Sequence, residues 1–188
     1  KRRTKNPYRS TAERIKNRVS IALRPVQVGK REIVGHWESD SVAGGDRKSG
    51  LNVIVERATR LVNISLMKNK TAKATKSAVI RRLSNHPEEL VKSITYDNGS
   101  ENVLHQEIND RLGVQSFFCE PYHSWEKGSV EQVNGLIRRY LPKGTDFSTV
   151  TATQINRIEK RLNNRPRKCL NYKTPYEMFR LARGALAA

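Results

Sequence analysis

The sequence predicts an α/β fold in which helices flank one mixed sheet. Short runs rich in Val and Ile come first, and strand and helix patterns alternate after them. The length of 188 residues suits one domain with a sizeable core. These observations together indicate one layered domain.

The first half of the predicted sheet is an antiparallel meander of three strands. The strands are expected over Gly35–Val42, Leu51–Glu56 and Leu61–Met67. Turn-forming residues separate them, Gly44-Gly45-Asp46 in the first connection and residues 57–60 in the second. Because short connections favour hairpins, neighbouring strands of this meander should run in opposite directions.

Helices and strands alternate after the meander. Residues Thr71–Leu83 lack Gly and Pro and begin with a Thr cap, which predicts a helix. A strand, a helix closed by Gly113 and a further strand are expected over Val91–Tyr96, Asn102–Leu112 and Gln115–Cys119. Further helices are expected over Ser129–Leu141, Thr151–Asn163 and Pro175–Ala182. The resulting order βββ-α-β-α-β-α predicts a mixed sheet.

Charge is distributed unevenly along this chain of net charge +18. Residues 1–34 hold 11 Lys and Arg against 2 acids, residues 138–188 hold 12 against 3, and the stretch between them is neutral. Two basic flaps around a neutral core indicate a protein that grips a polyanion, and we expect DNA. Residues 1–34 are interpreted as a basic arm or linker with a short helix over Thr11–Val19, and residues 35–188 as the core domain with C-terminal helices.

The cysteines and the apolar runs indicate the cellular setting. Cys119 and Cys169 lack metal-ligand spacing and are too few for a disulfide framework, so reduced thiols in a cytoplasmic protein are expected. No run reaches the roughly 18 apolar residues of a membrane span. Because the chain opens at Lys1 rather than Met, we expect a fragment that lacks a further N-terminal domain.

The helix predicted at Ser129 carries the strongest local pattern. Ser129 and Gln132 have the spacing of a capping box. An apolar stripe follows, made of Val130, Val133, Ile137 and Tyr140. Glu131, Asn134 and Arg138 fall on the opposite face, where a carboxylate, an amide and a guanidinium suit metal, sugar or base, and phosphate contacts.

Two aspartates are expected near strand ends. Asp97 follows an apolar strand, and ligands in α/β sheets gather beyond the carboxyl ends of strands. Asp40 shares one face of its strand with Glu38, so spacing alone leaves either residue as the first metal ligand. With Glu131, these carboxylates suit Mg²⁺, which prefers hard oxygen ligands. Asp46 and Glu101 are further acids nearby in the sequence without such a position.

Five ordered motifs over about residues 33–180 carry a resemblance to a known family. They are Gly35-His36-Trp37-Glu38-Ser39-Asp40, Tyr96-Asp97-Asn98-Gly99-Ser100-Glu101, residues 124–138, residues 141–147 and residues 162–168. The chain resembles the catalytic part of bacterial insertion-sequence transposases of the IS-thirty type, within the D-D-E transposase and retroviral integrase superfamily. Two departures, Ser39 for Gly and Val130 for Asn, leave the carboxylates intact and affect local DNA contacts instead.

The resemblance implies a ribonuclease H-like fold with the catalytic and metal-binding triad Asp40, Asp97 and Glu131, which decides between Asp40 and Glu38. It implies two Mg²⁺ ions, with Mn²⁺ as a substitute, Asp40 bridging both ions. It further implies cleavage of DNA at the terminal inverted repeats of an element, followed by attack of the freed 3′-hydroxyl on a target phosphodiester. The alternatives are a metal-dependent nuclease of the same fold and a non-catalytic DNA-binding module derived from a transposase.

The resemblance also implies partners and DNA contacts. The protein is expected to act in the bacterial cytoplasm, at the nucleoid, as a homodimer or larger assembly that holds two DNA ends. The candidate DNA-binding residues are Asn134, Arg138, Lys143, Arg165, Arg167, Lys168, Lys127 and His123. Lys127 precedes a helix start and His123 lies in the loop before it, positions where a phosphate or a water could be contacted.

Overall fold

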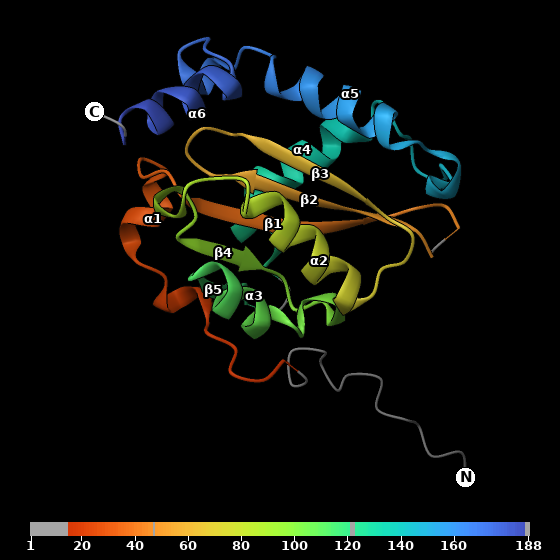
Figure 1. The fold of residues 1–188 in the computed structure, drawn as a ribbon, viewed down its shortest axis with the longest axis horizontal. Coiled ribbons are helices and arrows are strands. Elements are labelled where there is room, and N and C mark those ends of the chain that lie inside the picture. Colours follow the sequence, from red (N-terminus) through yellow and green to blue (C-terminus); the bar gives the residue numbers. More distant parts are fainter. Residues whose placement is uncertain (1–14, 47, 121–122, 187–188) are drawn as a thin grey trace.

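The computed structural model describes residues 15–46, 48–120 and 123–186, and it contains one five-stranded sheet (Figure 1). The strands in chain order are β1 His36–Ala43, β2 Gly50–Glu56, β3 Val62–Met67, β4 Ser93–Tyr96 and β5 Gln115–Phe118. Their order across the sheet is β3-β2-β1-β4-β5. The predicted element order and the predicted mixed sheet are confirmed.

Two kinds of strand pairing meet at β1. It pairs with β2 antiparallel, and β2 pairs with β3 in the same way, as the predicted meander requires. On its other side β1 runs parallel to β4, with Glu38 opposite Thr95, and β4 runs parallel to β5. The carboxyl ends of β1, β4 and β5 therefore lie at one edge of the sheet, where polar side chains can converge.

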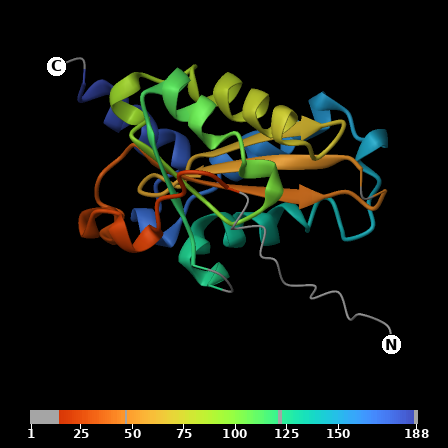
Figure 2. The ribbon, with the colours of Figure 1, turned by 90° about the horizontal axis from the view of Figure 1, so that it is seen from below.

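Helices cover both faces of the sheet (Figure 2). The helices α2 Ala72–Leu83 and α3 His105–Leu112 lie on one face, and α4 Gly128–Ile137 lies on the other. The helix α5 Ala152–Asn163 runs beside β3, and α6 Pro175–Gly184 follows it. Each face has its own apolar cluster, one centred on β2, α4 and α5 and the other on Trp37, α2 and α3.

Threonine caps begin three of these helices, and the one at Thr71 was predicted from the sequence. The hydroxyls of Thr71, Thr151 and Thr174 accept hydrogen bonds from the third backbone amide of α2, α5 and α6. Thr151 and Thr174 complete capping boxes with Gln154 and Glu177. Among the described residues, no helix is long and apolar enough to cross a membrane.

Side chains of α5 satisfy the outer edge of β3. The Asn163 amide accepts a hydrogen bond from the Val62 N–H at 2.8 Å and donates to the Val62 carbonyl at 2.7 Å. Glu159 accepts from the Ile64 N–H at 2.6 Å and pairs with Arg82 of α2. The edge strand is therefore closed to pairing with another chain at these positions.

Residues 15–23, part of the predicted arm, lie against the core and the β5 edge of the sheet. Ile15 is buried in a core cluster, and Ser20 forms a parallel bridge with Phe118. The helix predicted over Thr11–Val19 is wrong for residues 15–19, where Asn17 has a left-handed φ of +52°, and residues 11–14 lie outside the described part. The short helix α1 Val26–Lys30 instead follows Pro25, whose fixed φ favours a helix start.

The helix α4 differs from prediction at both ends. It ends at Ile137 rather than Leu141, so Tyr140 lies beyond it, 40% exposed instead of in the apolar stripe. The capping box at Ser129 is wrong, because a 3₁₀ turn over Ser124–Lys127 runs directly into the helix and leaves no extended cap residue. Ser129 Oγ instead accepts a hydrogen bond from Arg60 at 2.6 Å.

Candidate active site

Asp40 and Asp97 lie just beyond the parallel pairing of two adjacent strands, β1 and β4. Asp40 belongs to β1, and Asp97 directly follows Tyr96, the last residue of β4. The pairing of Glu38 with Thr95 brings the two aspartates to matching positions two residues further along the strands. The fold therefore brings together two of the three predicted metal ligands.

The ammonium of Lys127 lies between these carboxylates. Its Nζ donates a hydrogen bond to Asp40 Oδ1 at 3.0 Å and lies 3.4 Å from Asp97 Oδ2. It also donates to the Ser39 carbonyl at 3.2 Å, and its side chain is only 4% exposed. Burial alone would lower the pKa of Lys127, but Asp40 and then Asp97 raise it above its ordinary value. Lys127 is thus a buried cation held by two acids.

Hydrogen bonds orient both aspartates. Asn134 of α4 donates its Nδ2 to Asp40 Oδ2 at 2.6 Å. Asp97 Oδ1 accepts from the Gly99 N–H at 3.1 Å and from Asn102 Nδ2 at 2.8 Å. Each carboxylate therefore has one oxygen fixed by a neutral donor and the other directed at the Lys127 ammonium.

Glu38, the other candidate for the first ligand, anchors α4 instead. It is fully buried and accepts a hydrogen bond from the Val130 N–H at 2.9 Å, one of the free amides of the first helical turn. Its second oxygen lies 2.9 Å from Nε of Arg57. Burial lowers the pKa of Arg57 to about 10, with Arg24 adding repulsion and Glu38 opposing it. Both oxygens of Glu38 are thus used within the fold.

Glu131 is exposed on α4. It lies three residues before Asn134, which places both residues on one face of the helix. Within the part of the chain that the structure describes, no group of three or more His, Cys, Asp or Glu side chains is close enough to hold a metal ion. Asp40 and Asp97 converge, whereas Glu131 faces solvent beside them.

The two converging carboxylates fit a divalent cation. They already direct one oxygen each at a single positive charge, and hard carboxylate oxygens are the ligands that Mg²⁺ prefers. The Lys127 ammonium stands in for such a cation. A metal ion held by both aspartates would therefore have to displace the Lys127 side chain.

The remaining predicted DNA contacts are scattered around this centre. Arg138 donates from Nη2 to the Ala43 carbonyl at 3.0 Å, and its guanidinium carbon lies 5.7 Å from the Phe147 ring centre. His123 is exposed, with Nδ1 at 3.6 Å from Glu126 Oε1. Lys143, Arg165 and Lys168 are exposed, and Arg167 is half-buried. The fold does not gather these residues at the aspartates.

Two features of the site could not be predicted from local patterns. The sequence places Lys127 next to a helix start, a position that suggested a phosphate contact, but its carboxylate partner Asp40 is 87 residues away. Arg60 was not predicted to lie near α4 at all, because its partner Ser129 is 69 residues away. The sequence holds one signal for this contact: residues 57–60 contain no acid that could pair with Arg60 locally.

Such a sheet, with two carboxylates on neighbouring parallel strands just beyond their pairing, is typical of a domain of the ribonuclease H-like class. The chain belongs to the integrase core domain family, whose pattern matches residues 31–124. It is 45% identical to the transposase of insertion sequence IS4351 from Bacteroides fragilis over 96% of this chain and 54% of that protein. It is 36% identical to transposase InsI of IS30A from Escherichia coli K12 over 95% of this chain and 46% of that protein. The predicted family is confirmed, and the chain spans about half the length of the curated relatives it matches.

Solved structures agree on the fold. The catalytic core domain of BIV integrase matches 82% of this chain and 99% of that chain, with a TM-score of 0.64 and 20% identity. The catalytic core domain of HTLV-2 integrase, solved in complex with magnesium, matches 77% of this chain and 96% of that chain, with a TM-score of 0.58 and 21% identity. Both likenesses establish the ribonuclease H-like fold.

Proposed function

We propose that this chain is the catalytic domain of a DNA transposase. It would cleave DNA strands at the ends of an insertion element and join them to target DNA by attack of a 3′-hydroxyl on a phosphodiester. One observation carries the proposal: Asp40 and Asp97, on adjacent parallel strands, direct their oxygens at one cation in a chain of the integrase core family. Curated relatives named as transposases support it.

Asp40, Asp97 and Glu131 would hold two Mg²⁺ ions, or Mn²⁺ in their place. Bound metal would stabilise the attacking and leaving oxygens of an in-line displacement. Asn134 would keep Asp40 oriented through its 2.6 Å hydrogen bond. Glu131 would join from the solvent-exposed face of α4, and Lys127 would leave its place between the aspartates. The magnesium in a solved relative supports this assignment.

DNA is the proposed substrate and partner. The net charge of +18 supports binding to a polyanion, since neutralised phosphates release counterions. Arg138, Lys143, Arg165, Arg167 and Lys168 are the proposed backbone contacts, with Lys127 and His123 near the helix start and Asn134 beside Asp40. A homodimer or larger assembly would hold two element ends together, in the bacterial cytoplasm at the nucleoid.

The test uses a pre-nicked duplex oligonucleotide with Mg²⁺ or Mn²⁺, with products resolved on a sequencing gel. Asp97→Asn and Glu131→Gln should each lower joined product by about a thousandfold, equivalent to roughly 4 kcal/mol in the barrier. Asp110→Asn, a change of the same kind at an exposed aspartate on α3, is the matched control and should retain activity.

The products also separate the alternatives. Cleavage without joining would identify a nuclease of the same fold, and DNA binding with neither product would identify a binding module. Full activity in Asp97→Asn would remove this residue from the site, and full activity in Glu131→Gln would reduce the metal ligands to the two aspartates.

A further inference from the structure

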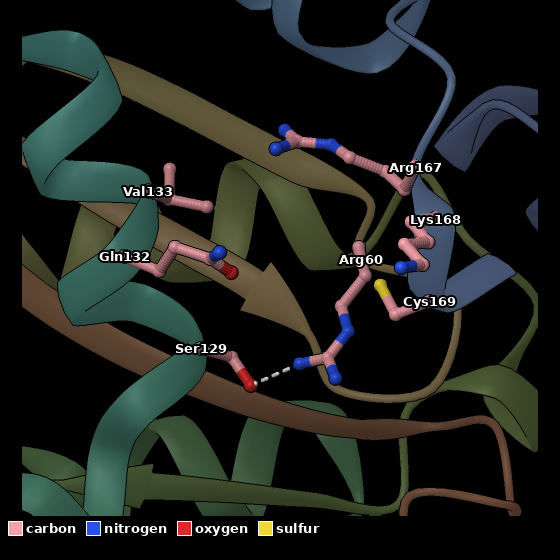
Figure 3. A pocket seen from close by; sticks show the side chains of 7 residues that line it. All are labelled: Arg60, Ser129, Gln132, Val133, Arg167, Lys168 and Cys169. Carbon is pink, nitrogen blue, oxygen red and sulfur yellow. Dashed lines mark hydrogen bonds between the residues drawn. The ribbon is translucent and has the colours of Figure 1, made fainter. Parts of the chain in front are cut away.

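A second charged site lies on the other flank of α4. It is a cavity of about 480 Å³ between α4, the turn that joins β2 to β3, and the 3₁₀ turn Lys168–Leu170 after α5 (Figure 3). Its lining residues are Arg60, Ser129, Gln132, Val133, Arg167, Lys168 and Cys169. We call it the cation pocket, because three of its side chains are cations and none is an acid.

The cations of this pocket lack a carboxylate partner. Among the described residues, Arg60, Arg167 and Lys168 take part in none of the ion pairs, which engage other residues. Nε of Arg167 is buried without a hydrogen-bond partner. Burial lowers the pKa of Arg167, and Arg165 and Arg60 lower it further by repulsion. Like charges that lie close together repel one another, so an anion at this place would be stabilised.

The pocket is held in shape by its own contacts. Arg60 has a left-handed φ of +64° in the turn after β2, and its Nη1 donates to Ser129 Oγ at 2.6 Å. Arg167 directs Nη2 towards the Leu162 carbonyl at 3.5 Å. Figure 3 shows the Arg60 and Arg167 guanidiniums and the Lys168 amine around one space beside Ser129 and Gln132. Guanidinium groups form charge-assisted hydrogen bonds with phosphate oxygens.

The helix α4 relates this pocket to the aspartates. Successive residues of an α-helix are about 100° apart around the axis. Asn134, which contacts Asp40, and Gln132, which lines the pocket, therefore lie on opposite flanks of α4. The exposed Glu131 lies on the arc between them. A DNA strand crossing Glu131 would pass from the aspartates to the cation pocket.

We propose that the cation pocket binds one backbone phosphate of the DNA strand that enters the aspartate centre. Arg60, Arg167 and Lys168 would supply the positive charge, and Ser129 and Gln132 the neutral hydrogen bonds. This site deepens the proposed function and rests on it. The pocket would fix the position of the strand without reading its sequence, as phosphate contacts do.

The experiment measures affinity for a short duplex oligonucleotide by fluorescence anisotropy over a series of salt concentrations. Arg60→Gln and Arg167→Gln should each weaken binding about tenfold, the value of one charge-assisted hydrogen bond. Each should also reduce the slope of log affinity against log salt by about one. Because both residues would hold the same phosphate, the double variant should lose less than the product of the single losses. Arg157→Gln, at an exposed cation of α5 outside the pocket, should leave affinity and slope close to wild type.

Folding and alternative ligands are controlled separately. Thermal unfolding reports whether Arg60→Gln, which loses the Ser129 contact, still folds, and Lys168→Gln removes an exposed cation without that risk. Unchanged slopes in folded Arg60→Gln and Arg167→Gln proteins would overturn the proposal. Inorganic phosphate that raises the melting temperature of wild type but not of Arg60→Gln, with unchanged DNA slopes, would assign the pocket to free phosphate and overturn the DNA assignment.

Failure of the pocket and failure of the proposed function give different results. Wild-type strand joining with unchanged salt slopes would overturn the pocket alone. Reduced slopes in the pocket variants of a protein that never joins strands would support the pocket while overturning the transposase proposal.

Discussion

The two charged clusters on either flank of α4 differ in how their charge is balanced. The aspartate centre holds Asp40 and Asp97 around the Lys127 ammonium. The cation pocket holds Arg60, Arg167 and Lys168 without an acid. A ligand that binds a site with its own counterion must displace that counterion. A ligand of opposite charge is attracted to a site without a counterion and displaces nothing. In the proposed function, metal would displace Lys127 from the aspartate centre, whereas a DNA phosphate would displace no acid from the cation pocket.

Both clusters depend on the placement of one helix. Lys127 ends the 3₁₀ turn that leads into α4, and Ser129 and Gln132 lie in its first turns. Glu38 fixes this end of the helix by accepting the Val130 N–H and pairing with Arg57 inside the fold. Disturbing Glu38 should therefore disturb both clusters together.

The largest effect is expected from a substitution of Glu38, which fixes the start of α4 for both clusters. Glu38→Gln removes the charge that balances the buried Arg57 and should lower the free energy of unfolding by about 3–5 kcal/mol, measured by urea denaturation. Glu107→Gln is the matched control, because it removes an acid from the exposed pair with Lys76 and should cost at most about 1 kcal/mol. Equal losses in both variants would show that the Glu38 pair does not anchor α4.

The sequence predicted those features of the two clusters that depend on short patterns of neighbouring residues. Local patterns indicated Asp97 after its strand and left Asp40 or Glu38 as its partner, and the family resemblance decided for Asp40. The parallel pairing of β1 with β4 then aligns Asp40 with Asp97. The roles of Lys127 and Arg60 depend on where α4 packs against the sheet, which no short pattern encodes. The Ser129 capping box was wrong because the 3₁₀ turn over Ser124–Lys127 runs directly into α4, and Glu38, a residue distant in sequence, accepts a first-turn amide of the helix instead.

A smaller effect is expected on metal affinity when the Lys127 ammonium is removed from the aspartate centre. Lys127→Met removes the internal cation and should raise affinity for Mn²⁺ in the absence of DNA by about tenfold, equivalent to roughly 1.4 kcal/mol. The reason is that metal no longer competes with an ammonium for the same two carboxylates. Isothermal titration calorimetry on the folded proteins measures this directly. Lys143→Met, a change of the same kind at an exposed lysine, is the control and should bind Mn²⁺ as wild type does. Unchanged Mn²⁺ affinity in Lys127→Met would show that the ammonium does not occupy the metal position.

The smallest expected effect is a change in DNA affinity that has opposite directions for the two clusters. Asp97→Asn removes a negative charge near the proposed path of DNA, so affinity in metal-free buffer should stay equal or rise by about two- to threefold, since one partly screened charge is lost. The cation pocket variants should shift affinity the opposite way under the same conditions. The amide that replaces the Asp97 carboxylate would keep an oxygen for the Gly99 N–H and Asn102 contacts, so the local fold should persist. A marked loss of affinity in folded Asp97→Asn would mean that this carboxylate supports DNA binding, through the position of Lys127 or of the loop. The charge of the two clusters would then no longer explain their separate roles.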